Sequence, residues 1–223
     1  MFTITIDGPA GVGKGTLARH LSAHYNLALL ETGLLYRCVG MIALKNQVAL
    51  DDEEKLARIA SQLTPSDLAQ EGLRLNEVSQ AASQIAVFHD VRQALFHFQR
   101  EFSAAPPLNF SGTILDGRDT GTVICPDAPI KFFIHAQVEI RAQRRFKELQ
   151  NQGIESIYTT VLQDMIERDT RDQQRAEAPL KAASDALVID TSFCTPEDVL
   201  NQAIDYVEMR RRSEEWQFFA DKH

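Results

Sequence analysis

Apolar side chains alternate with polar ones along short runs of the chain and recur every three to four residues along longer runs, a pattern that predicts strands separated by helices. Residues 2–6 alternate apolar side chains with threonines and are typical of a first strand. Further strands are predicted at residues 27–30, 113–115, 130–134 and 186–189. Helices are predicted at residues 16–25, 33–44, 52–63, 77–102 with a break near His89, 137–151, 156–171 and 196–212. Strands that alternate with helices predict an α/β fold, with a central parallel sheet covered by helices.

Glycine, proline and polar residues interrupt this pattern at residues 7–15, 64–67 and 104–112, which predicts turns or loops there. The sequence has no internal repeat, no low-complexity tract and no composition shift that would mark a linker. We therefore expect residues 1–223 to form one domain with insertions, a size within the range of single domains.

The composition is that of an ordinary globular domain, with 44% apolar and 24% charged residues, but the net charge is −8. An acidic chain is a poor binder of nucleic-acid polymers or anionic membranes, so neither is an expected partner. No run of about 18 apolar residues predicts a membrane span, and no signal peptide is predicted. The cysteines, Cys38, Cys125 and Cys194, are far apart, which argues against a disulfide scaffold and favours a reducing, cytoplasmic location.

Positive charge is concentrated in one segment of this acidic chain. Residues 141–181 carry eight basic and seven acidic side chains, and six of the eight cations are arginines. Because a guanidinium can bind phosphate through two hydrogen bonds, the segment is a candidate anion site. The alternative is a solvated helix with alternating charge pairs.

A glycine-rich segment lies between the first predicted strand and the first predicted helix, the context that a phosphate-binding loop requires. Its residues are Gly8, Pro9, Ala10, Gly11, Val12, Gly13, Lys14, Gly15 and Thr16, and we predict that they bind the phosphates of ATP. The glycines allow backbone N–H groups to surround the phosphates, and the helix N-terminus adds positive potential. Lys14 would reach the terminal phosphates as a cation.

The loop departs from the commonest pattern at one position. Gly15 stands where a Ser or Thr usually ligates Mg²⁺, and the hydroxyl follows at Thr16. We therefore predict no side chain as a dedicated metal ligand, and expect Mg²⁺ as a cofactor that is bound with ATP. The sequence contains no Asn-Lys-x-Asp motif for reading guanine, so a GTPase is not expected.

Three other clusters of residues indicate which second substrate accepts the phosphoryl group. They are residues 31–37, 116–123 and 168–180. The first two follow predicted strands, and ligands of open α/β sheets bind at the carboxyl ends of the strands. In the third, Arg168, Asp172 and Arg175 fall on one face of a predicted helix, and Arg171 lies on the same stripe. Arginines this close repel unless anions lie between them, which favours the phosphate-binding interpretation of the segment.

With these motifs in place, the chain resembles the bacterial-type cytidylate kinase family over nearly its whole length. The matching segments are residues 7–16, Thr32-Gly33 with Tyr36-Arg37, residues 77–83, 116–123 and 168–180. The phosphate-binding loop is shared by many families, whereas Asp116-Gly117-Arg118-Asp119 is much more specific when the segment from Arg168 to Leu180 accompanies it. The resemblance implies a three-layer P-loop kinase fold, with a nucleoside-monophosphate-binding insert at about residues 60–104 and a mobile lid at about residues 151–180.

The resemblance also implies roles for individual positions. The catalytic residues would be Lys14, Arg118, Arg168 and Asp119. The acceptor nucleotide would be bound by Thr32, Tyr36, Arg37, Ser83, Arg92, Arg118, Asp119, Arg168, Asp172 and Arg175. Within that set, Arg37 and Arg118 would hold the acceptor phosphate. The cytosine edge would be read by Ser83, Arg92, Asp119 and Arg175, whereas Arg168 and Asp172 would lie at the phosphate and sugar. Tyr36 has two alternative roles, which the sequence does not separate: its ring packs in the core, or it forms a wall of the acceptor site.

The implied function is in-line transfer of the γ-phosphoryl group of ATP to CMP or dCMP, by a cytoplasmic and monomeric enzyme of pyrimidine metabolism. The segment between Leu63 and Glu77 is shorter than is usual in this family, which leaves base selectivity and closure over the acceptor open. The alternatives are a kinase for another nucleoside monophosphate, such as UMP or AMP, and an ATP-binding regulatory protein without transfer activity. The tail that carries Trp216, Phe218 and Phe219 has no assigned role.

Overall fold

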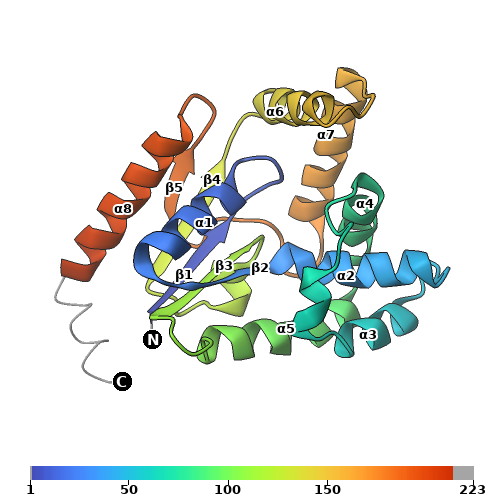
Figure 1. Ribbon diagram of the computed structural model, residues 1–223, viewed down its shortest axis with the longest axis horizontal. Coiled ribbons are helices and arrows are strands. Elements are labelled where there is room, and N and C mark those ends of the chain that lie inside the picture. The colour runs from blue at the N-terminus through green and yellow to red at the C-terminus, as the bar shows by residue number, and fades with distance from the viewer. Residues whose placement is uncertain (1, 213–223) are drawn as a thin grey trace.

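A computed structural model describes residues 2–212 and contains a central sheet flanked by helices (Figure 1). The strands are β1 (Phe2–Asp7), β2 (Ala28–Glu31), β3 (Gly112–Gly117), β4 (Ile130–His135) and β5 (Leu187–Asp190). They form one five-stranded sheet in the order β2-β3-β1-β4-β5, and each neighbouring pair is parallel. The predicted α/β fold with a parallel sheet is confirmed.

The helices connect these strands and supply both outer layers. They are α1 (Lys14–Tyr25), α2 (Thr32–Lys45), α3 (Glu53–Ser61), α4 (Asn76–Ile85), α5 (His89–Ala104), α6 (Val138–Asn151), α7 (Tyr158–Gln174) and α8 (Pro196–Arg212). A short 3₁₀-helix covers Pro65–Ala69, and one turn of π-helix covers Thr120–Ile124.

Two apolar clusters, one on each face of the sheet, define three layers. On one face, Ile4 and Ile6 of β1 belong to a buried cluster with Leu17 of α1 and Val199 of α8. On the other face, leucines of β2 and β3 belong to a second cluster with α2, α3 and α5. Burial of apolar surface on both faces supplies the main driving force for this arrangement.

The central strand β1 is covered on both sides, so its threonines are buried along with its isoleucines. Thr3 and Thr5 are at most 7% exposed. The Thr3 hydroxyl lies 3.1 Å from the hydroxyl of Thr113 on β3, which satisfies polar groups that have lost contact with water. The alternation that predicted this strand therefore separates apolar from polar side chains, and not buried from exposed ones.

The structure differs from the sequence-based expectations at several boundaries. The predicted break at residues 64–67 contains the start of the 3₁₀-helix, and the π-helical turn was not predicted. The predicted helical face shared by Arg168, Asp172 and Arg175 is wrong in one respect, because α7 ends at Gln174 and Arg175 has extended backbone. The aromatic tail at residues 216–219 lies outside the described residues.

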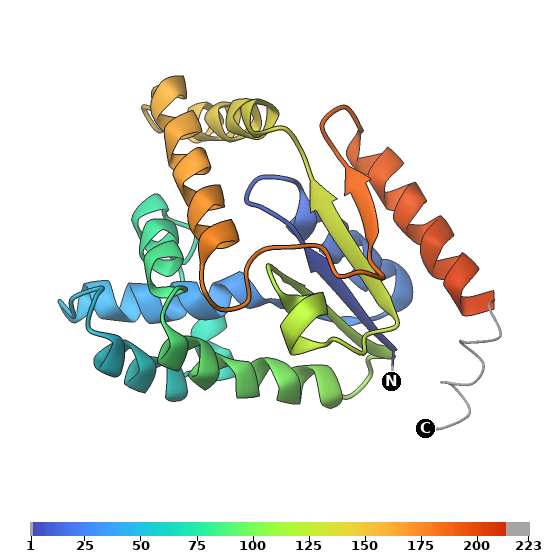
Figure 2. The same ribbon diagram turned by 180° about the vertical axis from the view of Figure 1, so that it is seen from behind.

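The predicted functional segments gather at the carboxyl edge of the sheet. The phosphate-binding loop connects β1 to α1, while β2 and β3 end at Glu31 and Gly117. Helix α4 contacts α7 beyond this edge, and α6 and α7 extend over it, as the view from behind also shows (Figure 2). Across residues 2–212, no helix is both long and apolar enough to cross a membrane.

Candidate active site

The phosphate-binding loop takes a shape that depends on two of its glycines. A Cβ atom at Gly8 would lie 2.0 Å from the carbonyl oxygen of Ile134 on the neighbouring strand, so a larger residue cannot be placed there. Gly13 has a φ of 94°, a conformation that L-residues with side chains rarely adopt, and it directly precedes α1. The loop therefore ends on the N-terminus of a helix, where N–H groups and the helix dipole favour anions.

Lys14 is the cation of this loop and is only 6% exposed. Its Nζ donates to the carbonyl oxygen of Pro9 at 2.7 Å, which holds the side chain across the loop. Burial, together with the positive charges of Arg118 and Arg168, lowers the pKa of Lys14 to about 7. A phosphate bound here would supply the missing negative charge and restore the ammonium form.

A half-buried carboxyl group and a buried hydroxyl group lie next to the phosphate-binding loop. Asp116, near the end of β3, faces Gly15 of the loop, and its carboxyl oxygen would lie 3.5 Å from a Cβ atom at that position. Burial raises the pKa of Asp116, and nearby Lys14 opposes that rise. The Thr32 hydroxyl donates to the backbone carbonyl of Asp116 at 2.9 Å, which ties the start of α2 to β3.

One continuous cleft of about 380 Å³ joins this loop to the predicted acceptor residues. Every predicted acceptor residue lines it: Thr32, Tyr36, Arg37, Ser83, Arg92, Arg118, Asp119, Arg168, Asp172 and Arg175. The cleft wall contains eight basic and five acidic side chains, although the chain as a whole carries a net charge of −8. A cleft with net positive charge in an acidic protein attracts anionic ligands selectively.

Arg118 lines the cleft directly after β3 and forms a largely buried ion pair. Its Nε donates to Asp172 at 2.8 Å, so this contact joins the end of β3 to α7. Although burial alone would raise it, Arg118 and Arg168 hold the pKa of Asp172 below its ordinary value. Burial and nearby Arg118 lower the pKa of Arg168 to about 10. The Nε of Arg168 is buried without a hydrogen-bond partner in the described part of the chain, so it remains available as a donor.

The far end of the cleft is built around the carboxylate of Asp119. Arg92 of α5 donates to one carboxylate oxygen at 2.5 Å, and Arg175 lies 3.5 Å from the other. The side chain of Arg175 is 4% exposed, and within residues 2–212 its Nη2 has no hydrogen-bond partner. Ser83 completes this end, where its hydroxyl accepts from Arg171 at 3.3 Å. Donors and acceptors therefore stand close together at a site shielded from water, as recognition of a polar heterocycle requires.

Asp7 fixes the backbone that carries Asp119. Its buried carboxylate accepts from the N–H groups of Thr120 and Gly121, at 2.8 and 2.7 Å, and from the Thr120 hydroxyl. Burial raises the pKa of Asp7 to about 6 in spite of these hydrogen bonds. The π-helical turn that follows Asp119 is thus anchored to β1.

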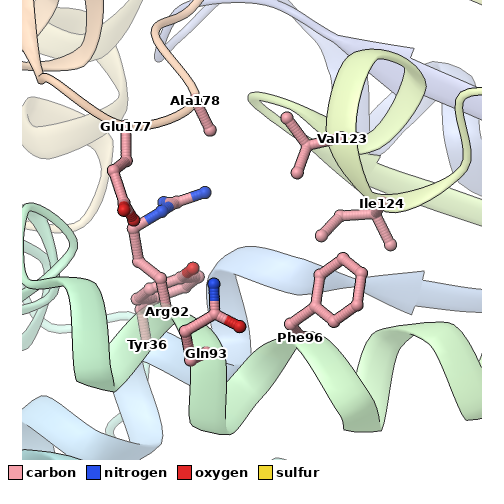
Figure 3. Close-up of a pocket in the computed structure, with 8 residues that line it drawn as sticks. All are labelled: Tyr36, Arg92, Gln93, Phe96, Val123, Ile124, Glu177 and Ala178. Atoms are coloured by element: carbon pink, nitrogen blue, oxygen red, sulfur yellow. The ribbon is translucent and has the colours of Figure 1, made fainter.

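A second cavity of about 230 Å³ adjoins the acceptor end (Figure 3). It is lined by Tyr36, Arg92, Gln93, Phe96, Val123, Ile124, Glu177 and Ala178, so it shares Tyr36 and Arg92 with the main cleft. Figure 3 shows apolar Phe96 and Ile124 on one side and Arg92 with Glu177 on the other. Although burial opposes it, Tyr36, Asp119 and Glu177 raise the pKa of Arg92, which keeps that guanidinium charged.

The predicted site residues did not include several polar residues around this cleft. Glu31 pairs with Arg74 at 2.8 Å and with Arg19 at 3.3 Å, so it links the segment before α4 to α1. Ser79 contacts two of the predicted phosphate-binding arginines. A signal existed for Ser79, because it lies in a segment that matched the family, but its contacts depend on how α4 packs against α2 and α7.

A parallel sheet with a phosphate-binding loop, facing an arginine-lined second subsite, defines the class of P-loop phosphotransferases. A family described as cytidylate kinase matches residues 4–209, so the chain belongs to the cytidylate kinase family. A cytidylate kinase of Paramagnetospirillum magneticum is 50% identical, over 93% of this chain and 98% of that relative. A cytidylate kinase of Rhodopseudomonas palustris is 46% identical, over 93% of this chain and 96% of that relative. A solved structure of an uncharacterized protein from Eubacterium ventriosum matches the fold with a TM-score of 0.52 at 17% identity, over 93% of this chain and 99% of that one.

Proposed function

We propose that this chain transfers the γ-phosphoryl group of ATP to CMP or dCMP, giving ADP and the corresponding diphosphate. The observation that carries the base assignment is Asp119, a buried carboxylate between Arg92 and Arg175 at the far end of the cleft. Cytosine presents one amino donor beside a ring nitrogen and a carbonyl oxygen, which both accept. A carboxylate can receive the amino group while a neighbouring guanidinium donates to the acceptors. A base with a carbonyl at the amino position would place its oxygen against the Asp119 carboxylate, and these two acceptors cannot hydrogen-bond each other.

The acceptor phosphate is already an anionic nucleophile, so the reaction needs no general base. The residues have to bring two anions together and stabilise the charge of the transferring group. Lys14 would contact the terminal phosphates of ATP, and Arg37, Arg118 and Arg168 would hold the acceptor phosphate. The contact between Lys14 and Pro9 and the pair between Arg118 and Asp172 orient these cations before substrate binds.

Although the sequence predicted no dedicated metal ligand, the oxygen groups next to the phosphate-binding loop fit a magnesium ion that is bound with ATP. The half-buried Asp116 carboxylate lies next to the loop, and the Thr16 hydroxyl also lines the cleft. Mg²⁺ prefers oxygen ligands and usually keeps several waters, so one carboxylate and one hydroxyl with substrate phosphates are an appropriate set. When bound, the ion would neutralise charge on the phosphates of ATP.

Water must be excluded from the transferring group, and two segments cover the cleft. The insert at about residues 60–104 supplies α4 and α5, and the lid at about residues 151–180 supplies α7 and Arg175. Gly153, with a φ of 71°, is the proposed hinge of the lid. With the lid closed over both substrates, Arg168 would stay at the acceptor phosphate and the reaction would be sequestered from water.

Release of ADP, measured by a coupled assay across the nucleoside monophosphates, tests this function. We expect turnover with CMP and dCMP in the presence of Mg²⁺ and little with UMP, AMP or GMP. Faster turnover with UMP or AMP would reassign the acceptor. ATP binding without turnover on any monophosphate would instead indicate a regulatory protein. The cytoplasmic location and the monomeric state remain predictions, which cell fractionation and sedimentation would check.

A further inference from the structure

A single hydroxyl group, that of Ser79 on α4, lies between two arginines from other elements. Its Oγ accepts from Nη2 of Arg37 on α2 at 3.1 Å and from Nη1 of Arg168 on α7 at 3.0 Å. A hydroxyl oxygen has two lone pairs, and here both are directed toward guanidinium groups. Ser79 therefore joins three helices that are far apart in the sequence.

These two arginines repel each other, so a neutral acceptor between them helps to keep their guanidinium groups close together. Burial and the neighbouring cations Arg74 and Arg118 lower the pKa of Arg37, and Arg168 experiences a similar environment. The Leu73 carbonyl accepts from the other terminal nitrogen of Arg37 at 3.1 Å. The Ser79 hydroxyl is an acceptor that both guanidinium groups share, and it opposes their separation. Without it, the repulsion between the two cations would be less restrained.

We propose that Ser79 is a positioning residue that holds Arg37 and Arg168 at the spacing needed to grip the phosphate of the acceptor nucleotide. The inference rests on the proposed function, in which both arginines bind that phosphate. It concerns the phosphate alone, because the base-reading group Asp119 makes its contacts with Arg92 and Arg175 at the far end of the cleft. Loss of the hydroxyl should thus weaken binding of the phosphate and leave binding of the nucleoside unchanged.

The neighbouring residue Gln80 offers a matched control. Its side chain joins the same two helices, donating to Asp164 at 3.4 Å and accepting from Arg171 at 3.5 Å. Gln80→Ala therefore loosens the contact between α4 and α7 without touching either phosphate-binding arginine. If Ser79 serves only to dock the two helices, Ser79→Ala and Gln80→Ala should behave alike.

The experiment compares the KM for CMP, the KM for ATP and the inhibition constant of cytidine, which lacks the phosphate, in the full chain and its variants. For Ser79→Ala we expect the KM for CMP to rise about three- to tenfold, because hydrogen bonds to charged groups are stronger than neutral ones. The KM for ATP and the cytidine constant should stay within about twofold of wild type, the usual limit of indirect effects. Ser79→Thr, which keeps the hydroxyl, should restore the KM for CMP.

Three outcomes would overturn the proposal: an unchanged KM for CMP in Ser79→Ala, an equal rise in Ser79→Ala and Gln80→Ala, or an equal loss of cytidine binding. If thermal unfolding shows that Ser79→Ala does not fold, Ser79→Cys replaces it, since a thiol is similar in size and a weak acceptor. Wild-type turnover of CMP tests the proposed function separately, so the failure of either claim can be identified.

Discussion

The donor and acceptor ends of the cleft are built in different ways. The donor loop is one continuous segment at residues 8–16, whose shape depends on glycines and whose proposed ligand groups are backbone N–H groups and one lysine. The acceptor end is assembled from side chains on α2, α4, α5 and α7 and in the segments that directly follow β3 and α7. The donor loop is therefore determined by local sequence, whereas the acceptor end depends on the packing of the whole fold.

The two ends also balance charge differently. Lys14 donates to a backbone carbonyl and has a pKa lowered to about 7, so its missing counter-charge has to come from the ligand. At the acceptor end, Arg118 and Arg92 already form largely buried ion pairs with Asp172 and Asp119. Substitution at the donor end should affect catalysis with little effect on folding, while substitution at the acceptor end disturbs a partner as well.

Removal of the lysine is the most direct test of this comparison and should have the largest effect. We expect Lys14→Ala to lower kcat by about 10³-fold or more, because one preorganised cation at the transferring group is lost. The melting temperature should not fall, since the replaced ammonium group is destabilised by burial. Steady-state kinetics and thermal unfolding measure both effects. Near-normal turnover would contradict the role of Lys14, and a fall in stability would remove the contrast between the two ends.

Arg118→Ala should have the next largest effect. We expect kcat to fall by about 10²-fold, because an acceptor-phosphate cation is lost while Lys14 remains. The variant should fold, since Asp172 keeps the nearby positive charges of Arg168 and Arg175. Asp172→Asn is the control, which loosens the same pair without removing the cation and should cost less activity. A larger loss in Asp172→Asn than in Arg118→Ala would show that the ion pair, and not the cation, matters.

The same contrast explains what the sequence could and could not predict. The five strands and the phosphate-binding loop follow from local patterns, because periodicity and a contiguous motif contain enough information to define them. Arg175 shows the limit of local reasoning: it follows the end of α7 with extended backbone, yet its guanidinium reaches Asp119. The family resemblance named Arg175, whereas helical spacing placed it incorrectly.

The π-helical turn and the role of Ser79 could not be predicted, since both depend on contacts between distant segments. The turn at Thr120–Ile124 is held at its start by Asp7, more than a hundred residues earlier. Ser79 is a polar residue on an amphipathic helix, and only the packing of α2 and α7 gives it two arginine partners. Such contacts follow from tertiary packing, which overrides local preference.

Asp119→Asn examines the base-reading part of the acceptor end. The asparagine keeps the shape but replaces one acceptor oxygen with a donor, so the amino group of cytosine loses part of its partner. We expect the ratio of kcat/KM for CMP to that for UMP to fall by about tenfold or more. The ADP-release assay with both nucleotides measures this ratio, and thermal unfolding checks that Arg92 tolerates the loss of its partner. An unchanged ratio would mean that Asp119 does not read the base.

Substitutions of Tyr36 test how far the acceptor end depends on polar contacts. Removal of its hydroxyl should have the smallest effect of the changes considered. Tyr36 lines both cavities, and burial raises the pKa of its hydroxyl to about 12. The hydroxyl therefore stays protonated at neutral pH and cannot act as a base, so Tyr36→Phe should change kcat/KM for CMP by less than about threefold. Tyr36→Ala, which removes the ring, should raise the KM for CMP more than Tyr36→Phe does if the ring forms an acceptor-site wall. Equal kinetics in the two variants would assign Tyr36 to packing alone, and a large loss in Tyr36→Phe would make its hydroxyl part of the polar site.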